Sequence, residues 1–172
     1  MRKTDDRTNH FTVYRDGNTW CGVADTELPS LEALTETLKG SGINGEIDSP
    51  LQGHYAAMSL TLNWKTISPE ALALAEARAH DIVVRSSQQQ FDGAQGIYVQ
   101  QAVKASMRVI PKNTSPGKIA IGETTGTANE FSVLAYKLEI DEKVIVDVDV
   151  INFKAIINGV DQLAAVRKNI GL

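Results

Sequence analysis

Residues 138–172, LEIDEKVIVDVDVINFKAIINGVDQLAAVRKNIGL, hold the pattern that decides the fold of this chain. From Val144 to Ile151 every residue is valine or isoleucine except two aspartates. Because strand side chains alternate between two faces, the valines at even positions share one apolar face, and Asp147 and Asp149 lie on the other. The stretch therefore predicts a β-strand with one face buried against a core.

A turn and a short helix are predicted after this strand. Extended chain over residues 153–157 leads into Asn158-Gly159, residue types that tolerate positive φ. Asp161 is then placed to cap a helix whose apolar residues lie at positions 163, 166 and 170. The predicted helix ends with residues that stabilise a helix C-terminus, namely Arg167, Lys168 and Gly171.

The same stretch resembles the C-terminus of the major tail tube protein family of contractile-tailed phages and phage-tail-like bacteriocins (tailocins). Members close with an aspartate–asparagine strand, an asparagine-glycine-valine-aspartate turn, and an arginine before a final isoleucine- or leucine-glycine-leucine. The matching residues here are Asp149, Asn152, Asn158, Gly159, Val160, Asp161, Arg167, Ile170, Gly171 and Leu172. Agreement in both type and spacing over about 25 residues makes the motif specific.

The resemblance implies a structural protein and not an enzyme. In this family, subunits form hexameric rings that stack into the inner tube of a contractile tail, and phage DNA passes through the channel without tight binding. The implied partners are further copies of the chain, the tail sheath, the tape measure protein and the baseplate hub. The implied location is the virion tail, assembled in the bacterial cytoplasm, and no cofactor is implied.

Length and composition fit one domain over residues 1–172, a length at which roughly two-thirds of the unfolded surface is buried. Charged residues make up 22% of the chain, which is typical of a folded soluble protein. The net charge of −4 predicts no basic surface for tight nucleic-acid binding. No apolar run approaches the roughly 18 residues of a membrane helix, and the polar start is no signal peptide, so we expect no membrane anchor.

The N-terminal region predicts a β-hairpin. Residues 10–15 and 19–24 read as strands, and Asp16-Gly17-Asn18 between them is a strong turn signal. Cys21 is the only cysteine, which excludes an intrachain disulfide. We expect it to be a small packed side chain.

Residues 31–39 fit two structures. Ser30 is placed to cap a helix with leucines at 31, 34 and 38 on one face. The resemblance implies a long strand instead, and we favour the strand because packing overrides local propensity. In a strand, one face would carry a mixed set that suits an interface: Glu32, Leu34, Glu36 and Leu38.

A glycine-rich loop is predicted next. Residues 40–45 match the dinucleotide-binding pattern G-x-G-x-x-G, but the pattern requires a following helix, and Pro50 disfavours one. The resemblance implies a mobile arm that contacts the next ring of a stack. Its residues are Gly40, Gly42, Ile43, Asn44, Gly45 and Asp48.

The middle of the chain predicts strand, helix and strand. Residues 54–65 predict a half-buried strand with Met58, Leu60, Leu62 and Trp64 facing inward. Ser68-Pro69-Glu70 predicts the start of a helix, which we expect to run to about Ile82. Residues 86–95 are expected to form a polar loop.

Two more strands are predicted downstream, at residues 97–110 and 130–140. On the second, Leu134, Tyr136, Leu138 and Ile140 are expected to share a face. Asp141-Glu142 links it to the C-terminal strand. The family often has aspartate-glycine at that turn, so Glu142 predicts a longer loop.

Together these elements predict a mainly β (α+β) fold. We expect two packed antiparallel sheets or a partial barrel, with one mid-chain helix and a short C-terminal helix. The resemblance implies that the strands of several subunits close into one β-barrel tube in the assembly.

Motifs of catalysis or metal binding are not found. The chain has no G-x-S-x-G, H-E-x-x-H or P-loop pattern. Asp147 and Asp149, roughly 7 Å apart on one strand face, fit a carboxylate pair or a cation site, but a polar interface is the favoured interpretation. The histidines lack the spacing of ligands. We therefore assign no catalytic, cofactor or metal residues.

Two functions remain open. In a tube, closure removes exposed strand edges, apolar faces pack against the subunit's own second layer, and polar faces line the channel. The channel-lining residues would be Ser59, Thr61, Asn63, Lys65, Gln100, Lys104, Ser106 and Arg108. The alternative is a monomeric β-barrel or sandwich that binds a small ligand in an apolar pocket.

Overall fold

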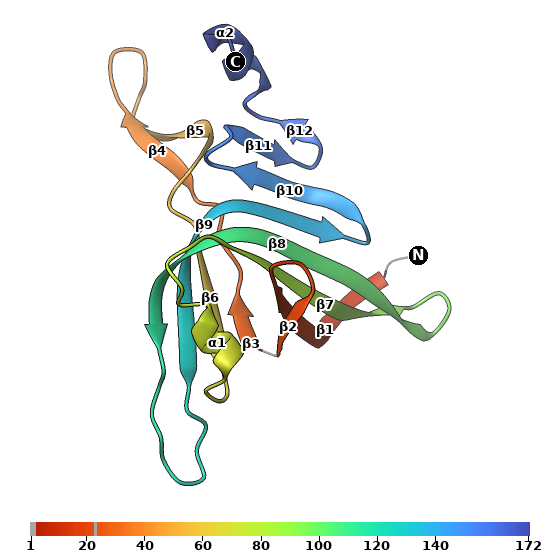
Figure 1. The fold of residues 1–172 in the computed structure, drawn as a ribbon. Helices are drawn as coiled ribbons and strands as arrows, with labels where there is room; N and C mark the ends of the chain where they lie inside the picture. Colours follow the sequence, from red (N-terminus) through yellow and green to blue (C-terminus); the bar gives the residue numbers. More distant parts are fainter. Residues whose placement is uncertain (1–2, 23) are drawn as a thin grey trace.

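The computed structural model describes residues 3–22 and 24–172 (Figure 1). The elements in this part of the chain, in order, are β1 (Lys3–Arg15), β2 (Thr19–Gly22), β3 (Ala24–Glu27), β4 (Ala33–Leu38), β5 (Ile47–Tyr55), β6 (Ser59–Trp64), α1 (Pro69–Ala73), β7 (His80–Asp92), β8 (Ile97–Ser115), β9 (Thr127–Ile140), β10 (Lys143–Asp149), β11 (Lys154–Ile157), β12 (Val160–Asp161) and α2 (Ala164–Ile170). The predicted mainly β fold with a mid-chain helix and a short C-terminal helix is confirmed.

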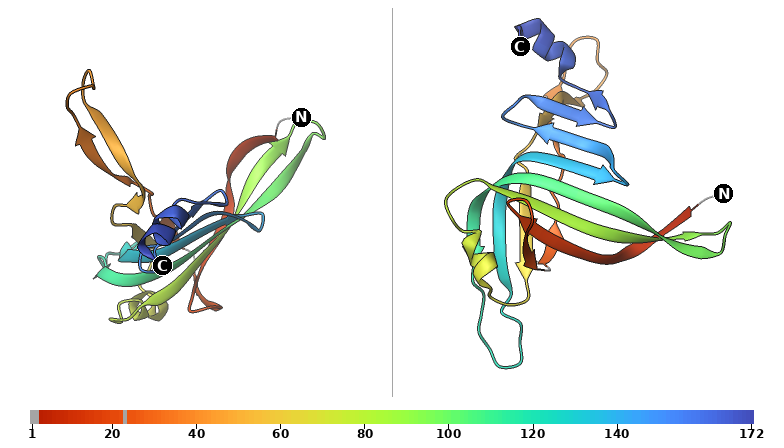
Figure 2. Two further views of the ribbon diagram at one scale, coloured as in Figure 1. Left: turned by 90° about the horizontal axis from the view of Figure 1, so that it is seen from above. Right: turned by 45° about the vertical axis from the view of Figure 1, so that its right-hand side comes forward.

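One large antiparallel sheet contains all strands except β4 and β5. Its main path runs β12-β11-β10-β9-β8-β7-β1-β2, and β6 joins it through β9 and carries β3 on its far side. The sheet curls so that β3 and β6 form a second layer over part of β7 and β8, without closing into a barrel (Figure 2). β4 and β5 form a separate two-stranded sheet that projects from the body.

β9 connects the two layers. Its first half pairs with β6, its second half pairs with β10, and β8 runs along its other edge. Between the halves, Arg108 faces Ala135 and Val109 faces Val133, so Leu134 is the extra residue of a β-bulge. The bulge reverses which residues point inward, because Phe131 and Val133 are buried before it and Tyr136 after it. The predicted shared face of residues 134–140 is therefore wrong at Leu134.

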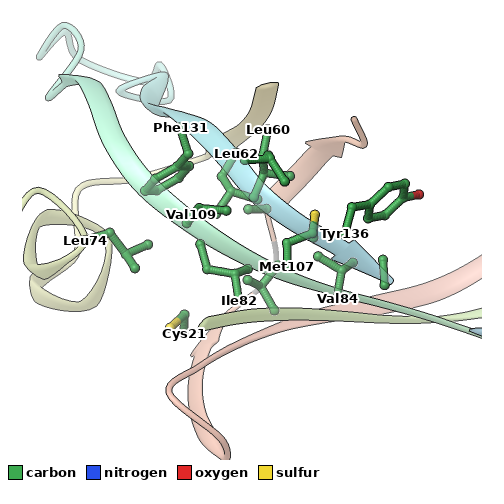
Figure 3. Close-up of a cluster of buried hydrophobic side chains, with 14 of the residues drawn as sticks. Cys21, Leu60, Leu62, Leu74, Ile82, Val84, Met107, Val109, Phe131 and Tyr136 are labelled. Carbon is green, nitrogen blue, oxygen red and sulfur yellow. The ribbon is translucent and has the colours of Figure 1, made fainter. Parts of the chain in front are cut away.

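The core fills the space between the two layers (Figure 3). The predicted inward face of β6 is confirmed, since its apolar residues are 0–5% exposed. Asn129 is buried among them, and its Oδ1 accepts a hydrogen bond from Trp64 Nε1 at 2.7 Å. Its Nδ2 donates to Ala71 O at 3.2 Å and to Thr114 Oγ1 at 3.0 Å. The buried amide is thus fully paired.

The mid-chain helix is much shorter than predicted. Ser68 caps α1 as expected, with its Oγ accepting from Ala71 N at 3.1 Å. The helix nevertheless ends at Ala73, and β7 begins at His80, before the predicted helix end at Ile82. The expected polar loop at residues 86–95 is also wrong, since β7 runs on to Asp92. β7 is paired with β1 on one side and β8 on the other, and two hydrogen-bond ladders hold its polar residues in a strand.

The predicted turn and strands of the N-terminal third agree with the structure in part. Asp16–Asn18 links β1 to β2, although the predicted strand 19–24 ends at Gly22, and Val23 lies outside the described residues. Residues 33–38 form a strand, not a helix. The predicted strand 54–65 is divided between β5 and β6.

The turn at Asp141-Glu142 is not lengthened. It has two residues, with φ of 46° at Asp141 and 66° at Glu142, so Ile140 pairs directly with Lys143. The predicted longer loop is wrong because both residues adopt the left-handed conformation of a type I′ turn.

The C-terminal segment departs from prediction at two points. β10 ends at Asp149, so Val150 lies in a turn and is 58% exposed. Helix α2 begins at Ala164, and Asp161 belongs to β12 and not to the helix cap. Asp161 instead accepts the Leu163 backbone N–H at 3.0 Å and pairs with Arg167.

Candidate assembly surfaces

The outer polar face is the side of β7–β11 that points away from the core. Its centre is a cluster of charged side chains on adjacent strands. Lys104 on β8 stands between Arg85 on β7 and Glu139 on β9. Glu139 accepts from Lys104 Nζ at 3.2 Å and from Lys137 Nζ at 2.8 Å. The hydrogen bond from Lys137, with that from Lys104, lowers the pKa of Glu139.

The same face continues with further ion pairs. Arg108 Nε lies 3.7 Å from Asp81 Oδ1, and Lys154 pairs with Asp147. Ser106 stands in the next row, opposite Lys137. Most of these charges stand beside an opposite charge, whereas Arg85 stands beside Lys104, so the face is strongly polar and carries charges of both signs.

The structure places the eight proposed channel-lining residues in two groups. Gln100, Lys104, Ser106 and Arg108 lie along β8 on the outer polar face. The other group, Ser59, Thr61, Asn63 and Lys65, lies at β6 beside the first half of β9. A cross-strand row of Ser59, Ser132 and Ile110 joins the groups on one continuous surface.

Sequence reasoning missed much of the outer polar face. The sequence predicts no strand at β7, which carries Arg85, and does not assign the charged residues of β9–β11 to the lining. The sequence does contain one signal for these residues. Alternation along each strand puts Lys137 and Glu139 on one face of β9, and Asp147 and Asp149 on one face of β10. The cross-strand register, which brings these charges beside β8, is not readable from one strand.

The projecting arm, β4–β5 with the loop 39–46, carries the predicted glycine-rich segment at its tip (Figure 1). Gly42 and Gly45 have φ of 99° and 137°, which favour glycine at this reversal. Asp48 lies on β5 and accepts from Thr37 Oγ1 at 2.8 Å. Ile43, at the tip, is 39% exposed. The arm presents its tip and both strands to solvent.

The first half of the C-terminal motif forms a capped turn. Asp149 Oδ1 accepts the backbone N–H groups of Ile151 and Asn152, and its Oδ2 accepts the Asn152 side-chain amide at 2.6 Å. Burial raises the pKa of Asp149, and the hydrogen bonds from Asn152 and Ile151 outweigh this and lower it. The turn leads from β10 to β11.

The second half of the motif ties α2 to the sheet. Asn158-Gly159 is the two-residue turn between β11 and β12, with φ of 49° and 80°. Arg167 pairs with Asp161 and donates to Phe153 O at 2.9 Å. Gly171 is the left-handed C-cap of α2, as predicted. Val160, the first residue of β12, is 66% exposed.

The aspartates of β10 have partners within the chain. Asp147 pairs with Lys154 and Asp149 holds the turn, so neither points freely to a shared site. Among the residues that the structure describes, no group of three or more His, Cys, Asp or Glu has the arrangement of a metal site. The helices of the same residues include none of a length and hydropathy to span a membrane. Cys21 is 7% exposed, and burial raises the pKa of its thiol.

Comparison with known proteins agrees with this architecture. The family model of the phage tail tube protein FII matches residues 5–171. The tail tube protein of Escherichia phage P2 is 29% identical over 169 residues, which cover 94% of this chain and 95% of that protein. These matches confirm the resemblance found in the C-terminal motif. The chain belongs to the phage tail tube protein FII family, and it is therefore a structural component of a phage tail and not an enzyme.

Proposed function

We propose that this protein forms hexameric rings that stack into the inner tube of a contractile tail, with the outer polar face turned toward the channel. The observation that carries the orientation is the cluster of paired charges around Lys104, Glu139 and Lys137. Even paired charges are costly to desolvate between subunits, whereas a water-filled channel leaves them solvated.

The pairing of cations with carboxylates on this face suits the passage of DNA. A surface that neutralises several phosphates binds DNA tightly, because counterions are released on binding. Here Lys104 and Lys137 share the carboxylate of Glu139, and Lys154 pairs with Asp147. Carboxylates beside the cations weaken the attraction of such a lining for a phosphate backbone, so DNA can slide through the channel.

With the outer polar face turned toward the channel, the remaining surfaces are available for contacts with other subunits and tail proteins. The apolar sides of β8 and β9 pack against β6 and α1 within one subunit, which leaves α2 and the projecting arm for contacts between subunits. We infer further contacts with the tail sheath outside the tube, the tape measure protein inside it and the baseplate hub at one end. Family membership supports the tube over a monomeric ligand-binding barrel.

Electron microscopy of the purified protein, dilute and concentrated, tests the assembly. We expect sixfold rings or hollow tubes at high concentration. A uniform monomer at every concentration, also after seeding with a tail preparation, would contradict the proposal.

Labelling tests the orientation. In a Cys21→Ala background, Ser106→Cys is treated in assembled tubes with a small maleimide and with one on a polymer too large to enter the channel. We expect the small reagent to label the tubes throughout and the large one to label only free subunits. Equal labelling of tubes and free subunits by the large reagent would place Ser106 outside, and labelling of tubes by neither would place it between subunits.

A further inference from the structure

The chain contains two Asn-Gly dipeptides, Asn44-Gly45 and Asn158-Gly159. Asparagine is a chemically labile residue, because the backbone nitrogen that follows it can attack its side-chain carbonyl carbon. A glycine in the following position favours this attack, since it has no Cβ to shield its nitrogen. Water is the only further reactant, so the local conformation of each dipeptide decides whether it reacts.

The reaction passes through a ring in the backbone. A bond forms between the glycine nitrogen and Cγ of the asparagine, the Cγ–Nδ2 bond breaks, and Nδ2 leaves as ammonia with the proton of the glycine N–H. Water then opens this succinimide ring. Its attack at Cγ gives aspartate, and its attack at the backbone carbonyl carbon gives isoaspartate, whose chain continues through Cγ. No oxidant or reductant takes part.

The turn at Asn158 disfavours this attack. The glycine nitrogen must lie on the same side of the asparagine Cα–C bond as Cβ before it can reach Cγ. Asn158 and Gly159 have φ of 49° and 80°, as in a type I′ turn. The first central residue of such a turn has ψ of about +30°, the mirror image of a type I turn. This rotation directs the nitrogen of Gly159 away from Cβ of Asn158, so the turn must open before Asn158 can react.

Hydrogen bonds hold that turn closed. Ile157 pairs with Val160 across it, and the Asn158 N–H donates to Ile145 O of β10 at 2.7 Å. Opening the turn disrupts these bonds and therefore costs the free energy of a local unfolding. Solvent exposure does not distinguish the two sites, because Asn44 and Asn158 are both exposed.

Asn44 lies in a different environment, at the tip of the projecting arm (Figure 2). The last strand pair of the arm joins Leu38 to Ile47, and the loop between them extends into solvent. An ion pair of 3.6 Å between Lys39 and Glu46 spans the base of this loop. The loop is therefore restrained at its base and not at its tip.

The backbone around Asn44 is free to reach the reactive conformation. The φ angle of Asn44 is negative, unlike that of Asn158. Within the described residues, the Gly45 N–H donates no backbone hydrogen bond. A Cβ at Gly45 would meet no other atom within 4 Å, so neighbouring groups do not block rotation there. The side chain of Asn44 and the nitrogen of Gly45 can thus meet without the loss of a strand or a turn.

We propose that Asn44 is a site of spontaneous deamidation, and that the turn at Asn158 protects the second dipeptide. The product adds a carboxylate beside the Lys39–Glu46 pair, and isoaspartate also inserts a methylene group into the backbone of the loop. The tip of the arm therefore changes in charge and in shape as the protein ages. Because the reaction takes place within one chain, this inference does not depend on the proposed assembly.

Peptide mapping of the aged monomer tests the proposal. Dilute protein is incubated at mildly alkaline pH, and samples are digested with trypsin at mildly acidic pH, which limits reaction during digestion. Cleavage after lysine and arginine separates the two sites into peptides 40–65 and 155–167. Fragmentation by electron transfer distinguishes isoaspartate from aspartate. We expect the folded protein to lose Asn44 at least about tenfold faster than Asn158, because the turn at Asn158 must first open.

The denatured protein is the matched control. In guanidinium chloride the turn is lost, so the two asparagines should react at similar rates. Gly45→Ala should slow the loss of Asn44 by about tenfold or more, because its methyl group hinders the nitrogen, and should leave Asn158 unchanged. Asn44→Gln should abolish the modification of peptide 40–65, which also contains Asn63.

Three outcomes would overturn the proposal. Equal rates at Asn44 and Asn158 in the folded protein would show that the turn gives no protection. An Asn44 that stays intact in the folded protein and reacts in the denatured protein would show that the arm loop is restrained. Modification of peptide 40–65 in Asn44→Gln would place the reaction at Asn63.

Discussion

Gly53 lies so close to Leu163 that a Cβ at position 53 would come within 2.5 Å of Leu163 Cδ2. This contact joins the base of the arm to the segment just before α2. Tyr55 Oη donates to Gln162 Oε1 at 3.0 Å beside it, and the rings of His54 and Phe153 meet edge to face at 6.0 Å. The C-terminal segment from Phe153 to Leu163 therefore holds the base of the arm against the body.

Gly53→Ala is expected to loosen the base of the arm. The new methyl group meets Leu163, and φ of 74° at this position is strained for alanine. We expect a loss of about 2 kcal/mol at the arm base, read as faster cleavage of the arm by a protease at low concentration. Gly45→Ala, which has positive φ and open space around it, is the control and should lose less. Equal effects would show that the contact with Leu163 is unimportant.

Glu142→Gly is expected to stabilise the fold. Glu142 has φ of 66° in a two-residue turn, and relief of this left-handed strain contributes about 1 kcal/mol. Thermal unfolding of the monomer measures the gain as a higher Tm. Asp141→Gly should show no such gain, because the Asp141 carboxylate accepts the Ala102 backbone N–H at 2.9 Å. A lower Tm for Glu142→Gly would contradict this account of the turn.

Asn129→Ala is expected to lower the free energy of unfolding by about 2–4 kcal/mol. The substitution leaves Trp64 Nε1 and Ala71 O without their buried partners and opens a small cavity. Chemical denaturation of the monomer, followed by Trp fluorescence, measures the loss. Asn63→Ala on the exposed face of β6 is the matched control, and an equal effect of the two would refute a special role for the buried amide.

We expect the ion pairs of Glu139 to make the stability of the fold depend on pH. Its pKa is lowered from 4.5 in the folded state, first by the hydrogen bond from Lys137. The stability it contributes is therefore fully present above about pH 5 and is lost as the pH falls through the folded pKa. Glu139→Gln should show a flatter loss of stability between about pH 5 and pH 3. Glu142→Gln, which removes a carboxylate without an ion pair among the described residues, should follow the parent, and parallel curves for all three would contradict the prediction.

Local patterns predicted the short-range features of this fold. The face of β6, the cap at Ser68 and the turn at Asn158-Gly159 each depend on residues near one another in the chain, and each is confirmed. β7 was missed because a strand of serines and glutamines forms only when neighbours on both sides supply its hydrogen bonds. The bulge at Leu134 was missed for a related reason, since it arises where β9 changes partners.

The assembly surfaces were predictable to a similar extent. Alternation along β8 separated its polar side from its apolar side, and the structure keeps that separation between Val103 and Val109. The ion pairs of Glu139 depend on register between strands, which one sequence does not state. The mixed face of β4 is predicted from alternation, but its continuation onto β5 follows only from the pairing of Leu38 with Ile47.

β9 has a mechanical consequence for a tube that must transmit force. The strand runs unbroken from one layer to the other, bonded to β8 along one edge and to β6 and β10 in turn along the other. Separating the layers by a pull along β9 requires many ladder hydrogen bonds to break together in shear, and not one after another as in peeling. We therefore expect a subunit to resist a pull along β9, and deformation to concentrate in the contacts between subunits.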